Sequence, residues 1–150
     1  MKFSAGHTTI FSATDREPLH GHMYTVYLAL TTLVEENGMT FDYRYYKVRI
    51  KELCQSLNQI FLMPQFSPYL TISEDETYLY FTFDNKKMPF LKEDVKILPV
   101  TNITVEELSK WFVTALVQDK QELDRHRIQK LVVKVFSAPG QSASHEWNRS

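Results

Sequence analysis

Residues 20–34 constrain the fold of this chain more than any other part of the sequence, because their side chains alternate in character at every second position. Successive side chains of an extended strand point to opposite faces of a sheet. One face would therefore carry His22, Tyr24, Val26, Leu28 and Leu30. The pattern predicts a long strand that is buried on one face.

Residues 1–10 alternate in the same way and predict a first strand. One of its faces would carry Phe3, Ala5, His7 and Thr9. Only a short loop separates the two strands, so we expect them to pair as an antiparallel ladder. After the long strand, Glu36-Asn37-Gly38 signals a turn, because Asn and Gly adopt positive φ at low cost.

Two segments have the spacing of amphipathic helices. Apolar residues recur three and four positions apart within residues 44–57. A second helix is expected to begin at Thr104, whose hydroxyl can cap the free amide of Glu107. Its apolar stripe would consist of Leu108, Trp111, Phe112, Ala115 and Leu116.

Between the two helices, residues 64–99 are interpreted as an inserted hairpin and loop, with short β-like runs at 69–72 and 78–83. A last strand is expected over residues 129–136. The order strand, strand, helix, insertion, helix, strand predicts an α+β fold. The length of 150 residues suits one domain that covers residues 1–150.

Composition argues against several classes of function. Lysine plus arginine (17) nearly balances aspartate plus glutamate (18), and no basic cluster is dense enough to follow a phosphate backbone, so we expect no nucleic-acid partner. The 43% of hydrophobic residues is ordinary for a soluble protein, and no membrane association is expected. The single cysteine, Cys54, and the lack of a signal-like N-terminus predict a reducing, cytoplasmic location.

Three of the five histidines lie within the first 22 residues, on the two strands that are expected to pair. His20 and His22 would project to the same face of their strand, and the neighbouring strand can supply His7. Three neutral imidazoles with an open fourth position are typical of catalytic zinc. The alternative is that they are ordinary strand histidines. His126 and His145 are expected to be exposed, with His145 a minor candidate for an active-site role.

Four short segments occur in the order in which one known family has its signatures. They are FSAGH at residues 3–7, LHGHMY at 19–24, GMTFDY at 38–43 and TVEEL at 104–108. The chain therefore resembles the 6-pyruvoyl-tetrahydropterin synthase and 6-carboxytetrahydropterin synthase family.

The resemblance implies the tunnelling fold (T-fold), in which two helices are inserted between the second and third strands of a four-stranded antiparallel sheet. It implies that His7, His20 and His22 bind Zn²⁺. It also implies a homo-oligomer, a trimer or a dimer of trimers, with the active site between subunits.

The loop before the His-Gly-His motif departs from the usual family pattern. Family enzymes have a proton-transferring cysteine there, and this loop has none. Glu17, three residues before His20, resembles the subgroup in which a glutamate replaces that cysteine. Glu17 is therefore the candidate catalytic residue. A carboxylate near zinc can act as a general acid or base if partial burial raises its pKa toward neutrality. The alternative is a solvated loop carboxylate paired with Arg16.

Two further positions depart from the family. An Asp-His pair is expected after the first helix, but this chain has Asn58 and Gln59, which cannot relay a proton. The carboxylate that holds the pterin on the last strand is replaced by Ser137. At the second helix, Thr104 and Glu106 are the other candidate substrate-binding residues, and the alternative for Glu106 is stabilisation of the first helical turn.

The resemblance, together with the three histidines and Glu17, implies a zinc-dependent, lyase-type enzyme that acts on the C6 side chain of a reduced pterin, dihydroneopterin or its triphosphate. Arg16 is the nearest cation for a triphosphate. One alternative is a catalytically altered or inactive T-fold binding protein that retains zinc. Another is a purely structural zinc.

Overall fold

The computed structural model describes residues 1–150 and contains nine strands and three α-helices. The strands are β1 (Lys2–His7), β2 (His20–Thr32), β3 (Ile60–Pro64), β4 (Thr71–Glu74), β5 (Tyr78–Phe83), β6 (Lys86–Leu91), β7 (Val95–Leu98), β8 (Ile128–Ala138) and β9 (Gln141–Asn148). The helices are α1 (Arg44–Ser56), α2 (Val105–Leu116) and α3 (Lys120–Arg125), with a 3₁₀ turn η1 at Lys92–Asp94.

The main sheet has the strand order β7-β3-β1-β2-β8-β9. Strands β1, β2, β8 and β9 run antiparallel to their neighbours in this order. The helices lie between β2 and β8 in sequence, as expected for the T-fold. The expected four strands are too few. Strand β3 adds to β1 in parallel and β7 adds to β3 in parallel, because both ends of the insertion continue the sheet at its β1 edge.

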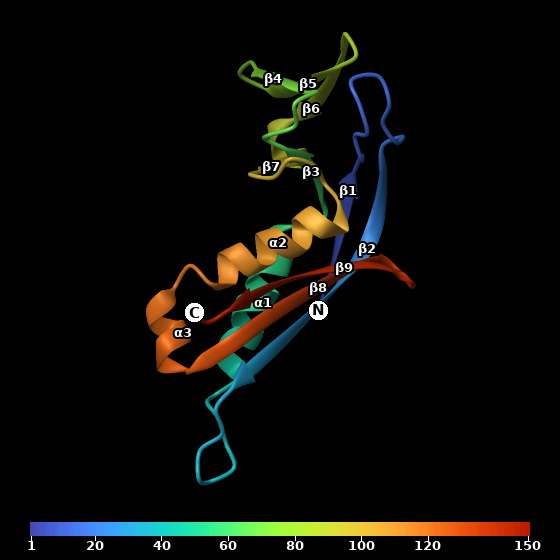
Figure 1. Cartoon of the computed structure of the whole chain (residues 1–150). Coiled ribbons are helices and arrows are strands. Elements are labelled where there is room, and N and C mark those ends of the chain that lie inside the picture. Colours follow the sequence, from blue (N-terminus) through green and yellow to red (C-terminus); the bar gives the residue numbers. More distant parts are fainter.

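The core lies between this sheet and helices α1 and α2, which pack against the same face (Figure 1). The predicted face of β2 is the buried one, with Tyr24 and Val26 each 1% exposed. Phe3 of β1 stacks on Tyr24 with ring centroids 4.9 Å apart and also meets Phe112 of α2. The hydroxyl of Thr104 accepts a hydrogen bond from the amide of Glu107, so α2 begins as predicted.

Two elements carry no clear pattern in the sequence. Strand β9 has the sequence QSASHEWN, with a single large apolar side chain, and it forms because it completes the ladder along β8. The short helix α3 begins at Asp119, whose carboxylate accepts a hydrogen bond from the amide of Glu122. None of the three helices has the length and apolar character needed to cross a membrane.

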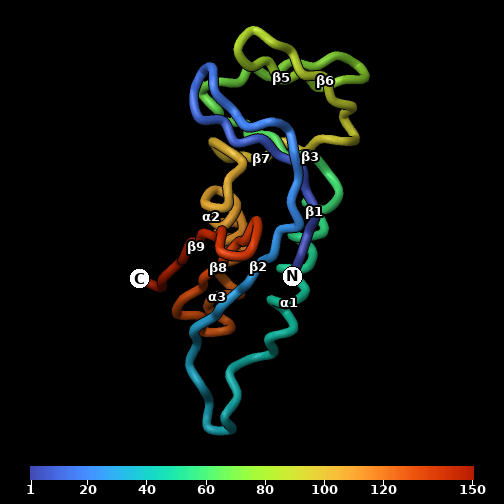
Figure 2. The backbone as a smooth tube through the Cα atoms, turned by 90° about the vertical axis from the view of Figure 1, so that its right-hand side faces the viewer, coloured from blue at the N-terminus to red at the C-terminus, as the bar shows by residue number.

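The insertion between β3 and β7 forms a separate three-stranded antiparallel sheet, β4-β5-β6, which we call the meander. The expected hairpin therefore has one strand more than predicted. Asp84 and Asn85 make the tight turn between β5 and β6 with φ of 49° and 59°. Figure 2 shows the meander, in green and yellow, beside the blue loop that joins β1 to β2. A second small core lies between the meander and strands β3 and β7, around Met63, Phe81 and Val95.

Candidate metal site and its neighbouring carboxylate

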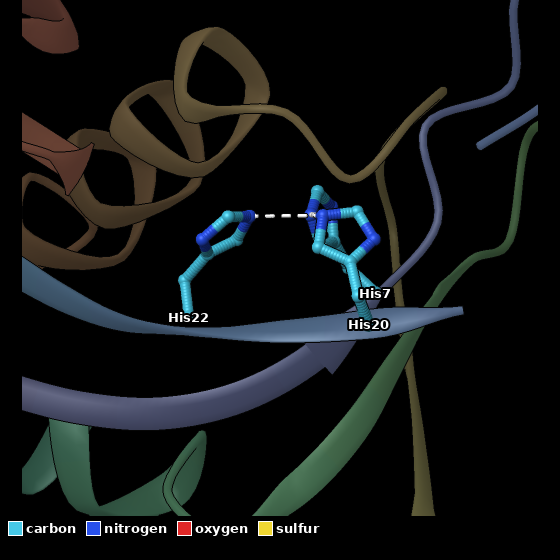
Figure 3. Close-up of side chains that lie close together, drawn as sticks. All are labelled: His7, His20 and His22. Carbon is cyan, nitrogen blue, oxygen red and sulfur yellow. Dashed lines mark hydrogen bonds between the residues drawn. The ribbon is translucent and has the colours of Figure 1, made fainter. Parts of the chain in front are cut away.

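The ladder between β1 and β2 brings three histidine rings to one place. His7 is the last residue of β1 and pairs with His20, the first residue of β2. His22 follows two residues later on the same face. Nε2 of His20 lies 3.1 Å from Nε2 of His7 and 3.0 Å from Nε2 of His22. Figure 3 shows the rings of His20 and His22 meeting through these nitrogens.

Backbone carbonyl groups determine the tautomers of two of these rings. Nδ1 of His7 lies 2.8 Å from the carbonyl oxygen of Ile103, and Nδ1 of His20 lies 2.7 Å from that of Pro18. A carbonyl oxygen only accepts, so each Nδ1 carries the proton and donates it. In the neutral ring, Nε2 is then a bare lone pair. Two lone pairs that face each other at 3.1 Å repel unless a cation lies between them.

The chemistry of this donor set fits zinc. Tetrahedral zinc with Zn–N distances of about 2.0–2.1 Å holds its ligand nitrogens about 3.3 Å apart. The nitrogen separations of 3.0 and 3.1 Å are close to that value. Carbonyl acceptors on the far ring nitrogens are the usual second layer of a zinc site. Burial lowers the pKa of His7 and of His22, which favours the neutral rings that metals bind.

Glu17 lies beside the ring nitrogens, in the loop between β1 and β2. Its amide donates to the carbonyl of Thr9 (2.9 Å), and its Oε2 accepts from the amide of Thr9 (3.1 Å). Oε2 is 4.0 Å from Nε2 of His7 and 3.9 Å from Nε2 of His20. These distances are longer than those between the ring nitrogens, so the carboxylate lies beside the group of three nitrogens and is not part of it.

The condition for Glu17 to act as a general acid, a pKa raised by burial, is not met. Burial does push this pKa up, but the hydrogen bond from Thr9 and the neighbouring His7 and His20 outweigh burial, and the pKa of Glu17 falls below its ordinary value. The side chain remains 35% exposed, which limits the effect of burial. Glu17 is therefore ionised at neutral pH and suited to accept a proton rather than to donate one.

The loop that carries Glu17 is held from two sides. On one side, Asn102 accepts from the amide of Ile10 (3.2 Å) and donates to its carbonyl (2.8 Å). On the other, Arg16 donates from Nη1 to the carbonyl of Glu17 (2.8 Å) and lies over the ring of Phe83. Arg16 thus contacts the backbone of Glu17, and no ion pair joins it to the Glu17 carboxylate.

Comparison with known proteins agrees with this fold. The model of the 6-pyruvoyl tetrahydropterin synthase family matches residues 1–148. The chain belongs to this family. A protein of Methanocaldococcus jannaschii that carries the name of a 6-carboxy-5,6,7,8-tetrahydropterin synthase is 26% identical over 148 residues, which are 97% of this chain and 89% of that protein.

Solved structures of the family have the same fold. The 6-pyruvoyltetrahydropterin synthase of Plasmodium vivax is 28% identical, with a TM-score of 0.92 over 99% of this chain and 92% of that chain. Two further structures of that enzyme, each 27% identical, are mutants in which a catalytic glutamate is replaced by cysteine or by alanine. The enzyme of Plasmodium falciparum matches with the same TM-score at 25% identity.

Asn58 and Gln59, which stand where the resemblance leads us to expect an Asp-His pair, contact strand β1. Asn58 accepts a hydrogen bond from the amide of Ser4 (2.8 Å), and Gln59 donates from its amide to the carbonyl of Ser4 (2.6 Å). Both residues therefore contact the backbone of β1 within the same chain. Gln59 has a positive φ of 58°.

The candidate substrate-binding residues are spread around the site. Thr104 follows Ile103, whose carbonyl holds His7, but its hydroxyl already caps α2. Glu106 is exposed in the first turn of α2. Ser137, near the end of β8, donates to the side chain of Gln141 at 3.4 Å. No hydrogen bond or ion pair links any of the three to the histidines.

Sequence reasoning missed Asn102 and misjudged His126. Asn102 precedes the cap of α2 by two residues, where a polar residue reads as ordinary loop. The side chain of His126 is only 13% exposed, because its ring stacks on Phe41 with centroids 4.7 Å apart and also lies against Tyr45 and Tyr46 at the start of α1. Charged neighbours in sequence suggested exposure. His145 is exposed, as expected.

Proposed function

We propose that this chain is a zinc-dependent, lyase-type enzyme that acts on the C6 side chain of a reduced pterin, dihydroneopterin or its triphosphate. One observation carries the proposal: the Nε2 atoms of three histidines meet, and Oε2 of Glu17 faces two of them at 3.9 and 4.0 Å. The relatives that are named as tetrahydropterin synthases support the substrate class.

His7, His20 and His22 are the proposed ligands of the metal. When bound, zinc would supply a Lewis acid that polarises the oxygen atoms of the substrate's side chain and acidifies the adjacent C–H. The carbonyl groups of Ile103 and Pro18 keep the Nε2 lone pairs of His7 and His20 directed at the ligand position.

Glu17 is the proposed base. Its lowered pKa keeps the carboxylate ionised at neutral pH, so it can remove the acidified proton without first losing one. The reciprocal hydrogen bonds with Thr9 hold the carboxylate in place before substrate binds. The catalytic glutamate of the Plasmodium vivax enzyme supports this role for Glu17.

Thr104, Glu106 and Ser137 are the proposed contacts to the pterin ring. Ser137 takes the place of a charged anchor, so ring binding relies on a neutral hydroxyl on β8 and on a carboxylate at the N-terminus of α2. A neutral hydrogen bond stabilises less than a charged one, and we expect weaker ground-state binding than in relatives that keep the carboxylate.

We also propose that the chain acts in the cytoplasm as a trimer or a dimer of trimers. After Val26, which is bonded to Met1, the edge of β2 that faces β1 has no neighbouring strand. The outer edge of β9 is also unpaired. Met23 and Tyr27 leave 59% and 60% of their surface exposed. Unpaired edges and exposed apolar side chains favour burial against another copy. Sedimentation that gives the mass of a monomer would contradict this assembly.

The test of function is direct. Zinc-loaded protein is incubated separately with dihydroneopterin and with its triphosphate, and products are followed by chromatography. The account expects turnover of at least one substrate, loss of turnover in Glu17→Gln, and retention in His145→Ala. No turnover of either substrate, with tight binding of one, would instead favour a binding protein that retains zinc.

A further inference from the structure

A side-chain contact joins the meander to the loop that carries Glu17. The guanidinium carbon of Arg16 lies 5.6 Å from the centre of the Phe83 ring, within the range of a cation–π interaction. Phe83 is the last residue of β5 and is 6% exposed, so its ring is buried where the meander meets the rest of the chain.

The other side of the same guanidinium reaches Glu17. Nη1 of Arg16 donates to the carbonyl of Glu17 at 2.8 Å, and the hydroxyl of the buried Thr8 donates to the same oxygen at 2.7 Å. With the amide of Glu17 bound to Thr9, the backbone of Glu17 is held at both of its polar atoms. The direction of the carboxylate toward the histidines follows from this backbone.

We propose that Arg16 is a positioning residue and that the meander, through Phe83, holds the Glu17 carboxylate at the site. This inference rests on the proposed function of Glu17 as the base. It gives the insertion a role in catalysis without placing any of its residues against the substrate. Arg16 is a bridge, because one planar group contacts an aromatic ring and a carbonyl oxygen at once.

Two pairs of matched variants test this role. Arg16→Met keeps the aliphatic stem and removes the guanidinium. Its control is Lys87→Met, because Lys87 of β6 lies 4.2 Å from the centre of the Tyr80 ring, and Tyr80 is on β5 like Phe83. Phe83→Leu removes the ring, and Tyr78→Leu is its control, because Tyr78 carries a 39% exposed ring on the same strand β5. Arg16→Lys keeps a donor and a cation.

Activity gives the first measurement, on the zinc-loaded full chain with the pterin that turns over. Because a base displaced by about 1 Å loses much of its effect, we expect Arg16→Met to lower kcat about tenfold and to change KM less than about twofold. Phe83→Leu should act in the same direction, Arg16→Lys should recover most of the loss, and both controls should match the wild type.

Hydrogen exchange gives the second measurement and needs no catalysis. Two amides are followed by mass spectrometry with fragmentation that resolves single residues. They are the amide of Thr9, which donates to the Glu17 carboxylate, and the amide of Glu17, which donates to the Thr9 carbonyl. If the loop is loosened, these two amides should exchange about tenfold faster in Arg16→Met and Phe83→Leu than in the controls. Unchanged exchange of both amides in these variants would overturn the positioning role. An active Glu17→Gln would instead overturn the role of Glu17 as the base.

Discussion

Glu17 and Thr9 are joined twice, since the amide of Glu17 donates to the carbonyl of Thr9 at 2.9 Å and the carboxylate of Glu17 accepts from the amide of Thr9 at 3.1 Å. The first bond belongs to the backbone and survives any side-chain change. The second depends on the length of the glutamate side chain. This arrangement allows the charge of the side chain to be removed without moving the loop.

The first prediction concerns Glu17→Gln, which keeps a side-chain oxygen for the amide of Thr9 but cannot take up a proton. Loss of a general base lowers kcat by about 10²–10⁴-fold. We expect this loss with unchanged zinc content and unchanged thermal unfolding, measured on the same preparation. A kcat within twofold of wild type would rule out Glu17 as the base.

The second prediction concerns Gly6, which pairs with Gly21 on the face of the sheet behind the histidines. A Cβ on Gly6 would lie 2.3 Å from Cδ2 of Phe61, so Gly6→Ala forces the Phe61 ring to move. We expect the free energy of unfolding to fall by about 1–3 kcal/mol in urea titrations. Gly6→Ala combined with Phe61→Leu should cost less than the sum of the two single changes, and simple additivity would contradict the clash.

The third prediction concerns the pH dependence of the meander. The Tyr80 hydroxyl (2.6 Å) and the amides of Tyr78 and Thr77 donate to Asp75 and lower its pKa to about 2. A lowered carboxyl pKa means that the stabilisation is complete above the ordinary value of 3.8 and is lost as the pH falls toward 2.

Asp75→Asn should therefore destabilise the protein at pH 6 and match the wild type near pH 2. Urea unfolding at both pH values measures the difference. Glu76→Gln is the control, because Glu76 has no side-chain hydrogen bond or ion pair. An Asp75→Asn effect of equal size at pH 6 and near pH 2 would show that these hydrogen bonds do not depend on the charge.

Sequence alone was sufficient where the local pattern and the tertiary contacts agree. The alternation in residues 20–34 predicted the buried face of β2, because Tyr24, Val26, Leu28 and Leu30 of that face belong to the main core or pack against it. Thr104 predicted the start of α2, because a cap depends only on residues three positions away. The convergence of His7 with His20 followed from one expected strand pair.

Sequence was insufficient where contacts between distant segments decide the outcome. The parallel pairing of β3 with β1 depends on where the chain returns after α1. The burial of His126 depends on Phe41, which lies far from it in sequence. The pKa of Glu17 is lowered by Thr9 across the loop, and no pattern within residues 12–18 reveals that hydrogen bond.

The most direct test of the whole account is the zinc content of the purified wild type beside His20→Ala, measured by elemental mass spectrometry after dialysis. His145→Ala serves as the control, because His145 is exposed and lies on β9. Three ligands predict about one zinc per chain in the wild type and in His145→Ala, and a large loss in His20→Ala with the fold retained. A wild type without zinc, or a His20→Ala variant with the same zinc content as the wild type, would contradict the account.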